Sequence, residues 1–456
     1  MSKEKRKVIT YGSFDLFHEG HYRLLKRAKE LGDHLTVGVT TEHYDVTRGK
    51  LNLVDPIMTR IENVKKTGFA DEIIVEDHEG QKIEDIQRYG IDVFTLGSDW
   101  AGRFDYLKQY CEVVYLPRTA GISSTELRNS RQSIVRIGII GTGRIAPRFF
   151  KETSYVSGIE VVAAYNPEEE SAKKFGDEFQ IKVWTDHFED FLEETDAVYV
   201  ASPNETHSDY VRKALEAGKH VLCEKPMTFT YQEAVELYDL AEKKGVTLME
   251  GIRTAYLPGF QQLLSVATNG TIGEICDVEA RFTRIGTPGS REMTDAKYSG
   301  AFLEYGSYTM LPIFKLLGKD YEGLQIESVY GENGIDILTK VHFRYANCLG
   351  MAVSGAGAKS EGQLVISGTK GYILAQSPWW LTKGFDVRYE DPMKIDHYDA
   401  TFSGEDGLRY EIAEFVGKIN ETGGNDYKLT AEESIAMADV VEKFMTKRRE
   451  YQKQLS

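Results

Sequence analysis

The chain has 456 residues, of which 41% are hydrophobic and 28% are charged. It is longer than the roughly 250 to 300 residues at which a single core stops growing, so we expect two or more folded domains and no long disordered region. Its 71 Asp and Glu against 55 Lys and Arg give a net charge of −16, which repels nucleic acid and anionic membranes. We expect neither as a partner, and any phosphate site must be local.

The four cysteines lie far apart, without a CxxC pair or a Cys/His spacing typical of metal sites. We expect reduced, mostly buried thiols and no protein-held metal. The start, MSKEKRK followed by VITYG, lacks the apolar stretch of a signal peptide, and no run approaches the roughly 18 apolar residues of a membrane span. These features predict a cytoplasmic protein.

Strand-like and helix-like stretches alternate along the first 130 residues. The strand-like runs are Val8–Tyr11, Leu35–Thr40, Glu72–Val75, Val93–Leu96 and Val113–Leu116, and the clearest helices are Tyr22–Leu31 and Lys82–Tyr89. This alternation predicts an α/β fold, a Rossmann-like parallel sheet with helices on both faces. A new strand, Ile134–Ile140, begins almost without a linker, so we place the first domain boundary near residues 131–133.

The segment GSFDLFHEGH carries the first candidate site. His18 and His21 lie three residues apart at the expected start of a helix, directly after a strand that ends in Gly12. That spacing puts both imidazoles beside unpaired backbone N–H groups. Helix N-termini attract phosphate, and two imidazoles can stabilise charge that develops on phosphorus. Gly20 allows a ligand to approach the backbone closely.

HEGH, together with RTAGISSTELR at residues 118–128, resembles the HxGH and RTxGISTT motifs of the cytidylyltransferase family, especially the glycerol-3-phosphate cytidylyltransferases. The resemblance covers nearly all of residues 7–131. It implies in-line attack of a substrate phosphate on the α-phosphate of CTP, with Mg²⁺, to give a CDP-alcohol and pyrophosphate. It makes His18 and His21 catalytic. The residues it implies for CTP or substrate binding are Gly12, Ser13, Phe14, Lys50, Arg60, Asp99, Trp100, Arg118, Gly121, Ile122, Ser123, Ser124 and Thr125.

The second candidate site begins with the strand Arg136–Ile140 and the turn GTGRIA. A GxGxxA pattern alone is weak. Here a strand precedes it and the next strand, Val161–Tyr165, follows at the spacing of a βαβ unit, so we predict a dinucleotide-binding turn. Its residues are Gly141, Thr142, Gly143, Arg144, Ile145 and Ala146. The position that usually holds an acidic residue for the ribose is Asn166, which leaves the choice between NAD and NADP open.

Two further loops follow expected strands at Ala197–Ala201 and His220–Leu222, and they read SPNETH and CEKP. With GTGRIA they resemble the Gfo/Idh/MocA oxidoreductase family, over the chain from about Val135 to its end. The resemblance implies cofactor contacts from the two loops and a catalytic or substrate-orienting role for the EKP lysine, Lys225. The implied contact residues are Ser202, Pro203, Asn204, His207, Glu224, Lys225 and Pro226.

The segment SGAFLEYGSYTM falls where that family carries GGALLDxGxH or DxGxY. Tyr308 then matches the catalytic His or Tyr, and Glu304 replaces the usual Asp. We expect hydride transfer to a carbonyl, with Tyr308 giving the proton, Lys225 polarising the carbonyl, and the ammonium lowering the pKa of the phenol.

Each of these residues also has a purely structural interpretation. A lone histidine is commonly a surface or capping residue, Ser-Ser-Thr an ordinary helix cap, and a loop lysine a solvated side chain. Trp100 and Tyr308 are equally compatible with core packing. Context within each motif favours function for the histidine pair, for the Ser-Ser-Thr segment and for Lys225.

The region from about Tyr256 to Asp399 is rich in strand-like runs such as Ile275–Thr283 and Lys340–Arg344, and predicts an open antiparallel sheet of an α+β domain. Trp379 and Trp380 suit a substrate wall or, better, an oligomer contact. We divide the chain into a cytidylyltransferase domain (1–132), a Rossmann domain (133–255), a substrate and oligomerisation domain (256–400) and C-terminal helices packed on the Rossmann domain (401–456).

Together these features predict a bifunctional enzyme. It would reduce a keto- or aldo-phosphate with NAD or NADP, pass cytidylyl from CTP to the resulting polyol phosphate for surface polymers such as teichoic acid or capsule, and form a dimer or tetramer. Three alternatives stay open. In the first, the second part is a non-catalytic domain that senses cofactor or dimerises. In the second, it reduces a different sugar. In the third, it acts on a nucleotide-linked substrate after cytidylyl transfer.

Overall fold

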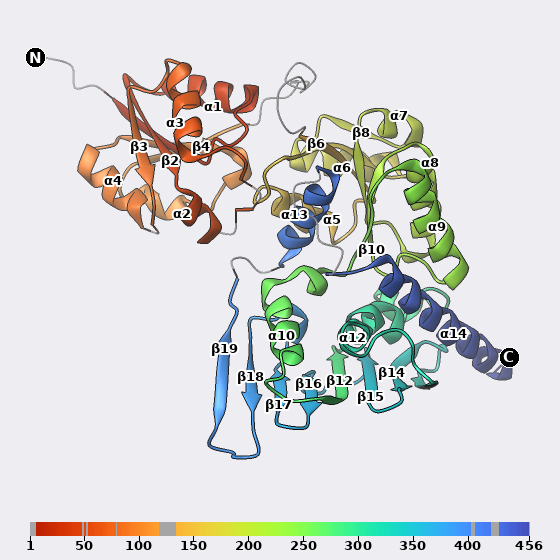
Figure 1. Cartoon of the computed structure of the whole chain (residues 1–456). Coiled ribbons are helices and arrows are strands. Elements are labelled where there is room, and N and C mark those ends of the chain that lie inside the picture. The colour runs from red at the N-terminus through yellow and green to blue at the C-terminus, as the bar shows by residue number, and fades with distance from the viewer. Residues whose placement is uncertain are drawn as a thin grey trace, which may run out of the picture. The chain divides into compact units, whose positions relative to one another are not determined.

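A computed structural model of the chain describes residues 6–47, 50–51, 53–78, 80–117, 134–402, 406–420 and 428–455. Within these residues the strands form three sheets, of five, six and eight strands (Figure 1). By its internal contacts the chain separates into two compact units, Met1–Ile137 with Arg144–Glu194, and Gly138–Gly143 with Thr195–Ser456. The four-domain division made from the sequence stays a prediction.

The five-stranded sheet has the order β3-β2-β1-β4-β5, and all its pairs are parallel. Its strands are β1 (Lys7–Gly12), β2 (His34–Thr40), β3 (Glu72–Glu76), β4 (Val93–Gly97) and β5 (Glu112–Leu116). Its helices are α1 (Glu19–Lys29), α2 (Glu42–Thr47), α3 (Ile57–Lys66) and α4 (Gln81–Tyr89), with short 3₁₀ turns η1 (Ser98–Trp100) and η2 (Asp105–Gln109). The order reverses between β1 and β4, and ligands of such sheets bind beside the carboxyl ends of these two strands.

Alternation along β1 explains why helices cover both faces of this sheet. Val8 packs into a cluster with Phe14 and Leu25, whereas Ile9 and Tyr11 pack into a second cluster that contains Phe94. Successive side chains of a strand point to opposite faces, so a strand that is apolar at consecutive positions must be covered twice. The parallel sheet expected from the sequence is confirmed.

The six-stranded sheet has the order β11-β10-β9-β6-β7-β8. Its strands are β6 (Val135–Ile140), β7 (Ile159–Tyr165), β8 (Val183–Thr185), β9 (Ala197–Val200), β10 (His220–Glu224) and β11 (Leu248–Gly251). Its helices are α5 (Ala146–Thr153), α6 (Glu169–Phe179), α7 (Phe188–Glu193), α8 (His207–Glu216) and α9 (Tyr231–Lys244), with the 3₁₀ turns η4 (Asn204–Thr206) and η5 (Arg253–Tyr256). The order again reverses at the first strand, β6, which is the arrangement of a dinucleotide-binding Rossmann fold.

The eight-stranded sheet has the order β13-β14-β15-β12-β16-β17-β18-β19. Its strands are β12 (Ile275–Thr283), β13 (Gly323–Tyr330), β14 (Asp336–Arg344), β15 (Leu349–Gly355), β16 (Leu364–Gly368), β17 (Tyr372–Ala375), β18 (Gly384–Arg388) and β19 (Ile395–Asp399). The expectation of a purely antiparallel sheet was wrong, because β12 and β15 run parallel. A long connection through a helix and a hairpin separates these two strands, which allows the parallel pairing.

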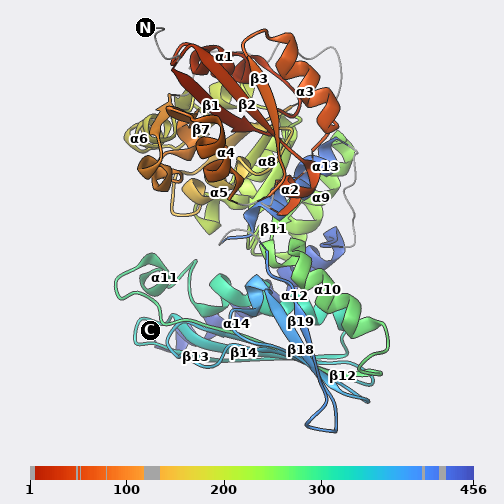
Figure 2. The same ribbon diagram turned by 90° about the vertical axis from the view of Figure 1, so that its left-hand side faces the viewer.

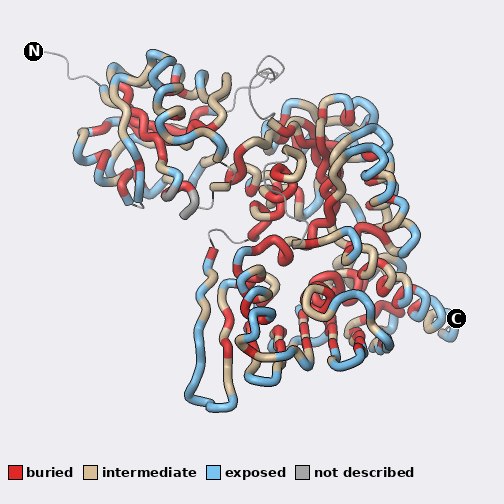
Figure 3. The backbone as a smooth tube through the Cα atoms, in the orientation of Figure 1, coloured by how far each residue is buried: buried red, intermediate tan, exposed pale blue. Residues whose placement is uncertain are grey.

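The remaining helices all lie in the second compact unit, which includes Thr195–Ser456. They are α10 (Pro258–Thr268), α11 (Arg291–Thr294), α12 (Ala301–Leu317), α13 (Leu408–Ile419) and α14 (Ala431–Leu455), with the 3₁₀ turn η6 (Trp379–Leu381). Helices α10, α12 and α14 lie on one face of the eight-stranded sheet (Figure 2). Figure 3 shows that burial concentrates in the central strands of the sheets and in the helices packed on them.

The structure gives all four cysteines as free thiols, of which Cys223 is buried, Cys276 is exposed and the other two are partly buried. The expectation of mostly buried thiols was therefore only partly correct. Among the described residues, no helix combines the length and the apolar character that a membrane crossing requires.

Candidate functional site

The turn after β1 brings the two histidines of the first motif together. His18 is the N-cap of α1, with extended backbone angles, and its Nδ1 accepts a hydrogen bond of 3.0 Å from the backbone N–H of Gly20. In the neutral ring the proton is therefore on Nε2. The ring of His21 stacks on that of His18, with 3.9 Å between centroids and 24° between planes.

His21 is held in its neutral form. Its Nδ1 is buried and has no hydrogen-bond partner among the described residues. The ring centroids of Phe14 and Phe17 each lie 5.5 Å from the centroid of the His21 ring. Burial lowers the pKa of His21 well below its ordinary value, and the charges of His18 and Lys50 add to the effect. An uncharged imidazole in a desolvated site can donate a hydrogen bond while it carries no formal charge.

The backbone of this turn is strained. Phe14 and Leu16 have positive φ angles of 52° and 45°, which residues other than glycine rarely adopt and which concentrate at functional turns. The carboxylate of Asp15 accepts hydrogen bonds from the backbone N–H groups of Val54, at 3.1 Å, and Asp55, at 2.7 Å. The turn is thereby tied to the segment that contains Val54 and Asp55.

Arg60, one of the residues that the resemblance implies for CTP or substrate binding, lies inside the fold. Its guanidinium donates hydrogen bonds to the carbonyl oxygens of Ser13 and Thr40, both at 2.8 Å, and of Asp55, at 2.9 Å. It is fully buried, and the carboxylate of Asp45, also buried, lies 3.6 Å away. These contacts fasten the histidine turn to the neighbouring loop.

The other expected CTP-binding residues divide into those that the structure describes and those that it does not. Lys50 donates a hydrogen bond of 2.9 Å to the carbonyl oxygen of Ser154, which belongs to the same compact unit. Trp100 follows β4, the strand next to β1, and the guanidinium carbon of Arg103 lies 5.2 Å from its ring. The backbone of Asp99 lies in the same turn. Residues outside the described part are Arg118, Gly121, Ile122, Ser123, Ser124 and Thr125.

The turn after β6 leaves room for a phosphate beside the backbone. Gly141 has a φ of +90°, and a Cβ atom there would lie 2.7 Å from the carbonyl oxygen of Ala201. Nothing lies within 4 Å of a Cβ at Gly143, so the turn is open on that side. Thr142, Arg144 and Ile145 complete it, and α5 begins at Ala146. A tight turn that excludes side chains, followed by a helix N-terminus, fits the pyrophosphate of a dinucleotide.

Asn166 directly follows β7, and its Oδ1 accepts a hydrogen bond of 2.9 Å from the backbone N–H of Glu168. It is neutral, as the sequence required, and brings no carboxylate to the end of this strand.

Lys225 follows β10 and meets two residues of α12. Its ammonium donates a 3.0 Å hydrogen bond to the carbonyl oxygen of Glu304, lies 3.9 Å from that residue's carboxylate, and is 5.7 Å from the ring centre of Tyr308. Burial alone would lower the pKa of Lys225, but the charge of Glu304 outweighs it and the pKa is raised. The lysine therefore stays protonated, as a residue that polarises a carbonyl must be.

Tyr308 differs from the expectation in one respect. Burial raises the pKa of its phenol, and the opposing charges of Arg253 and Lys225 do not overcome that effect. The ammonium of Lys225 lowers this pKa, as expected, but burial of the ring has the larger effect, so the net pKa of Tyr308 lies above its ordinary value. The phenol is held in its protonated form, which is the form that donates a proton.

His207 joins the two loops that carry the expected cofactor contacts. It is buried, its Nδ1 lies 2.9 Å from the carbonyl oxygen of Pro226, and its Nε2 lies 2.9 Å from that of Ser202. Pro203 and Asn204 continue the first loop into η4. On the other loop, Glu224 accepts a 2.6 Å hydrogen bond from the hydroxyl of Tyr199. The geometry gives His207 a positioning role between the loops.

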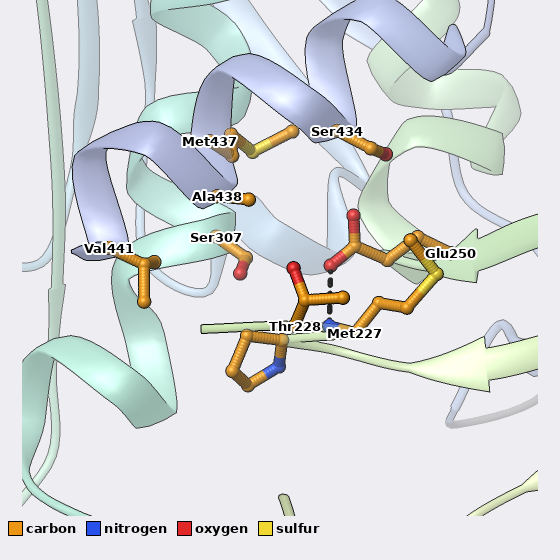
Figure 4. Close-up of a pocket in the computed structure, with 9 residues that line it drawn as sticks. Met227, Thr228, Glu250, Ser307, Ser434, Met437, Ala438 and Val441 are labelled. Atoms are coloured by element: carbon orange, nitrogen blue, oxygen red, sulfur yellow. Dashed lines mark hydrogen bonds between the residues drawn. The ribbon is translucent and has the colours of Figure 1, made fainter. Parts of the chain in front are cut away.

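A small cavity next to Pro226 and Met227 was not expected from the sequence (Figure 4). The carboxyl group of Glu250 faces it and accepts a 3.0 Å hydrogen bond from the backbone N–H of Met227. Burial raises the pKa of Glu250. Ser307, the neighbour of Tyr308 in the chain, and Ser434 of α14 also line the cavity. Glu250 ends up here because β11 runs parallel to β10, so their carboxyl ends coincide.

An aromatic stack beside Tyr308 was also not foreseen. Trp380 lies flat on Phe282, with 3.6 Å between centroids and 7° between planes, and Phe282 lies 5.6 Å from Tyr308. Trp379 is only 1% exposed and donates a hydrogen bond to the carbonyl oxygen of Arg281. Trp379 is thus a core residue, which neither interpretation of the tryptophan pair included.

The two sites define a two-part α/β enzyme, with a nucleotidyl-transferring part and a dinucleotide-dependent part. Comparison with known families agrees with this division. Residues 9–130 match the sequence model of the cytidylyltransferase-like family, and residues 135–252 match that of the oxidoreductase family with an NAD-binding Rossmann fold. The chain belongs to the cytidylyltransferase family through its first part and carries a Gfo/Idh/MocA oxidoreductase domain in its second.

Individual relatives cover each part. Glycerol-3-phosphate cytidylyltransferase of Bacillus spizizenii is 47% identical over 129 residues, which are 28% of this chain and 99% of the relative. Scyllo-inositol 2-dehydrogenase (NADP(+)) of Bacillus subtilis is 29% identical over 326 residues, covering 68% of this chain and 95% of the relative. The solved 3-ketoreductase KijD10 from Actinomadura kijaniata, in complex with NADP and TDP-benzene, superposes with a TM-score of 0.60 at 23% identity, over 68% of this chain and 96% of that one. This last likeness concerns the fold alone.

Proposed function

We propose that the first part transfers the cytidylyl group of CTP to a polyol phosphate such as glycerol 3-phosphate. An oxygen of the acceptor phosphate attacks the α-phosphorus of CTP, the bond from that phosphorus to the bridging oxygen breaks, and pyrophosphate leaves. The observation that carries this proposal is the stacked pair of His18 and His21 at the start of α1. The 47% identity to a glycerol-3-phosphate cytidylyltransferase supports the choice of acceptor class.

Each residue at the turn has a separate role in the transfer. His18 donates from Nε2 to the α-phosphate, because its Nδ1 is occupied by the N–H of Gly20. His21 adds a second uncharged ring, and Lys50 contributes positive charge for the acceptor phosphate. Mg²⁺ enters with the triphosphate as part of the substrate. Arg118 and the segment 121–125 bind the β- and γ-phosphates.

The test is pyrophosphate release with CTP, Mg²⁺ and glycerol 3-phosphate. We expect His18→Ala and His21→Ala each to lower the rate about 100-fold or more, the usual effect of removing one preorganised donor. His78→Ala is the matched control, because His78 is an exposed histidine of the same sheet domain, with 53% of its side chain accessible. Rates that stay within about threefold of the unmodified protein in both histidine variants would refute the assignment.

We propose that the second part reduces a keto- or aldo-phosphate to the polyol phosphate that the first part consumes. The turn of Gly141 would hold the reduced cofactor, NADH or NADPH, which would supply the hydride and leave as NAD⁺ or NADP⁺. Lys225 polarises the carbonyl with its protonated ammonium, and Tyr308 gives a proton to the oxygen as the alcohol forms. The observation that carries the proposal is the placement of a protonated lysine against a protonated tyrosine at the carboxyl edge of the sheet.

Oxidation of NADH or NADPH with a panel of three- to six-carbon keto- and aldo-phosphates tests this part. Tyr308→Phe removes one proton donor and should lower kcat by about 100-fold while leaving cofactor affinity unchanged. Tyr231→Phe, at an exposed tyrosine of α9, is the control. If the protein binds cofactor tightly, turns over no carbonyl compound and changes its cytidylyl-transfer rate instead, the second part is a cofactor-sensing scaffold.

The link between the two parts is tested by supplying CTP, Mg²⁺, reduced cofactor and one carbonyl phosphate together. A CDP-alcohol of the corresponding mass supports sequential action. Activities that require carbon skeletons of different length would exclude it.

A further inference from the structure

Arg253 lies beside the reductase site, and neither the motifs nor the proposed mechanism use it. It begins η5 two residues after β11, and β11 pairs with β10 so that Gly251 is opposite Glu224. The next residue, Thr254, donates a 2.7 Å hydrogen bond to the carbonyl oxygen of Trp380. Trp380 belongs to the aromatic stack that borders Tyr308, so η5 is held against the same group of side chains.

The guanidinium of Arg253 uses only one of its edges within the described structure. Its Nη1 lies 3.3 Å from the carbonyl oxygen of Asp406, to which it donates, and 3.8 Å from that residue's carboxylate. Its Nε is buried and has no hydrogen-bond partner among the described residues. The Nε–H group lies on the edge shared with Nη2, where two parallel N–H groups match a phosphate or carboxylate.

A buried donor without an acceptor is unfavourable and rare, so its acceptor is expected from outside the chain. The surroundings indicate which kind. The positive charge of Arg253 opposes the effect of burial on the pKa of Tyr308, and it does so ahead of Lys225. Two cations therefore act on the phenol. The carboxylate of Asp406 offsets the charge of Arg253, and that of Glu304 offsets the charge of Lys225. The donors on the Nε edge of Arg253 therefore remain available to an incoming anion.

We propose that Arg253 binds the phosphate group of the reductase substrate through its Nε edge, so that the second part selects carbonyl compounds that carry a phosphate near the reacting carbon. This inference rests on the proposed reductase function and adds to it the residue that recognises the phosphate. The phosphate stays bonded throughout and takes no part in the redox step. Arg253 acts on binding and specificity, and Lys225 and Tyr308 act on the carbonyl.

The test compares a phosphorylated carbonyl substrate with its dephosphorylated counterpart in the full-length protein. We expect the unmodified protein to prefer the phosphorylated compound. The Arg253→Gln substitution should raise the KM for the phosphorylated compound about 30- to 100-fold and change kcat less than about threefold. The KM for the dephosphorylated compound should not change. Arg253→Lys, which keeps the charge but not the fork, should recover only part of the preference.

Arg344→Gln serves as the matched control, since Arg344 is 62% exposed on the same unit and pairs with Glu322. The cytidylyl-transfer rate reports whether each variant is folded. Equal use of both compounds by the unmodified protein would overturn the role of Arg253 and leave the reductase function intact. A loss of kcat and a shifted pH profile that are equal for both compounds would overturn it as well, because Arg253 would then act through Tyr308.

If the unmodified protein reduces no carbonyl compound, the proposed reductase function fails, and the arginine is tested by binding. Inorganic phosphate is then titrated calorimetrically with CTP and NADP⁺ present to fill the two nucleotide sites. Binding that is lost in Arg253→Gln and kept in Arg344→Gln would support an anion site, whereas identical isotherms would refute it. If Nε of Arg253 binds only water, the Arg253→Gln and Arg344→Gln variants give identical isotherms, and that result counts against the proposal.

Discussion

Replacing Gly20 by alanine separates the orientation of His18 from its presence. A Cβ atom on Gly20 would lie 2.7 Å from Cε1 and 2.9 Å from Nδ1 of His18, closer than real Cβ contacts allow. The backbone of Gly20 is helical, so alanine itself fits there. The imidazole must therefore move, and the 3.0 Å bond from the Gly20 N–H to Nδ1 is lost.

Two effects on stability nearly cancel. Loss of the N-cap interaction costs about 1 kcal/mol, and alanine in a helix is favoured over glycine by up to about 1 kcal/mol. The free energy of unfolding should thus stay within about 1 kcal/mol of its original value. The rate of cytidylyl transfer should fall about 100-fold, because a donor that was aimed at the α-phosphate no longer points there.

The assay is the initial rate of pyrophosphate release, measured with denaturant unfolding of the same samples. Gly68→Ala is the control, since Gly68 has a φ of +71° and nothing within 4 Å of a Cβ. It should cost about 1 kcal/mol in backbone strain and leave the rate unchanged. The double variant His18→Ala, Gly20→Ala should be no slower than His18→Ala alone. A rate within about threefold of normal in Gly20→Ala would refute the reasoning.

Three further predictions concern other parts of the chain. Gly141→Ala would put a Cβ 2.7 Å from the carbonyl oxygen of Ala201; NADPH binding, followed by fluorescence, should be lost while cytidylyl transfer continues. Burial raises the pKa of Asp336 from 3.8 to about 6, so the folded state holds its proton longer, and about 2 kcal/mol of stability should be lost as the pH rises from 4 to 6; denaturant unfolding at several pH values checks this, and Asp336→Asn should flatten the profile. The lowered pKa of His21 has the opposite sign, so stability should decline as the pH falls below about 6.5 and the transferase rate should show no titration of His21 near that pH.

The sequence by itself determined the elements and the chemistry of each motif. Consecutive apolar residues in β1 required a sheet covered on both faces, and the spacing of His18 and His21 placed both rings on one turn of a helix. Glycine at position 141 indicated a tight turn in which a side chain at that position has no room. These are local properties, set by the periods of helix and strand and by the size of one side chain.

Only the tertiary structure decided which charges meet. Arg60 and Lys225 are both cations next to motifs, yet the first is enclosed by carbonyl oxygens and the second faces Tyr308. The raised pKa of that phenol and the unused Nε edge of Arg253 depend on residues from distant parts of the chain. Burial and pairing are properties of the packed fold, and the sequence pattern around each residue does not contain them.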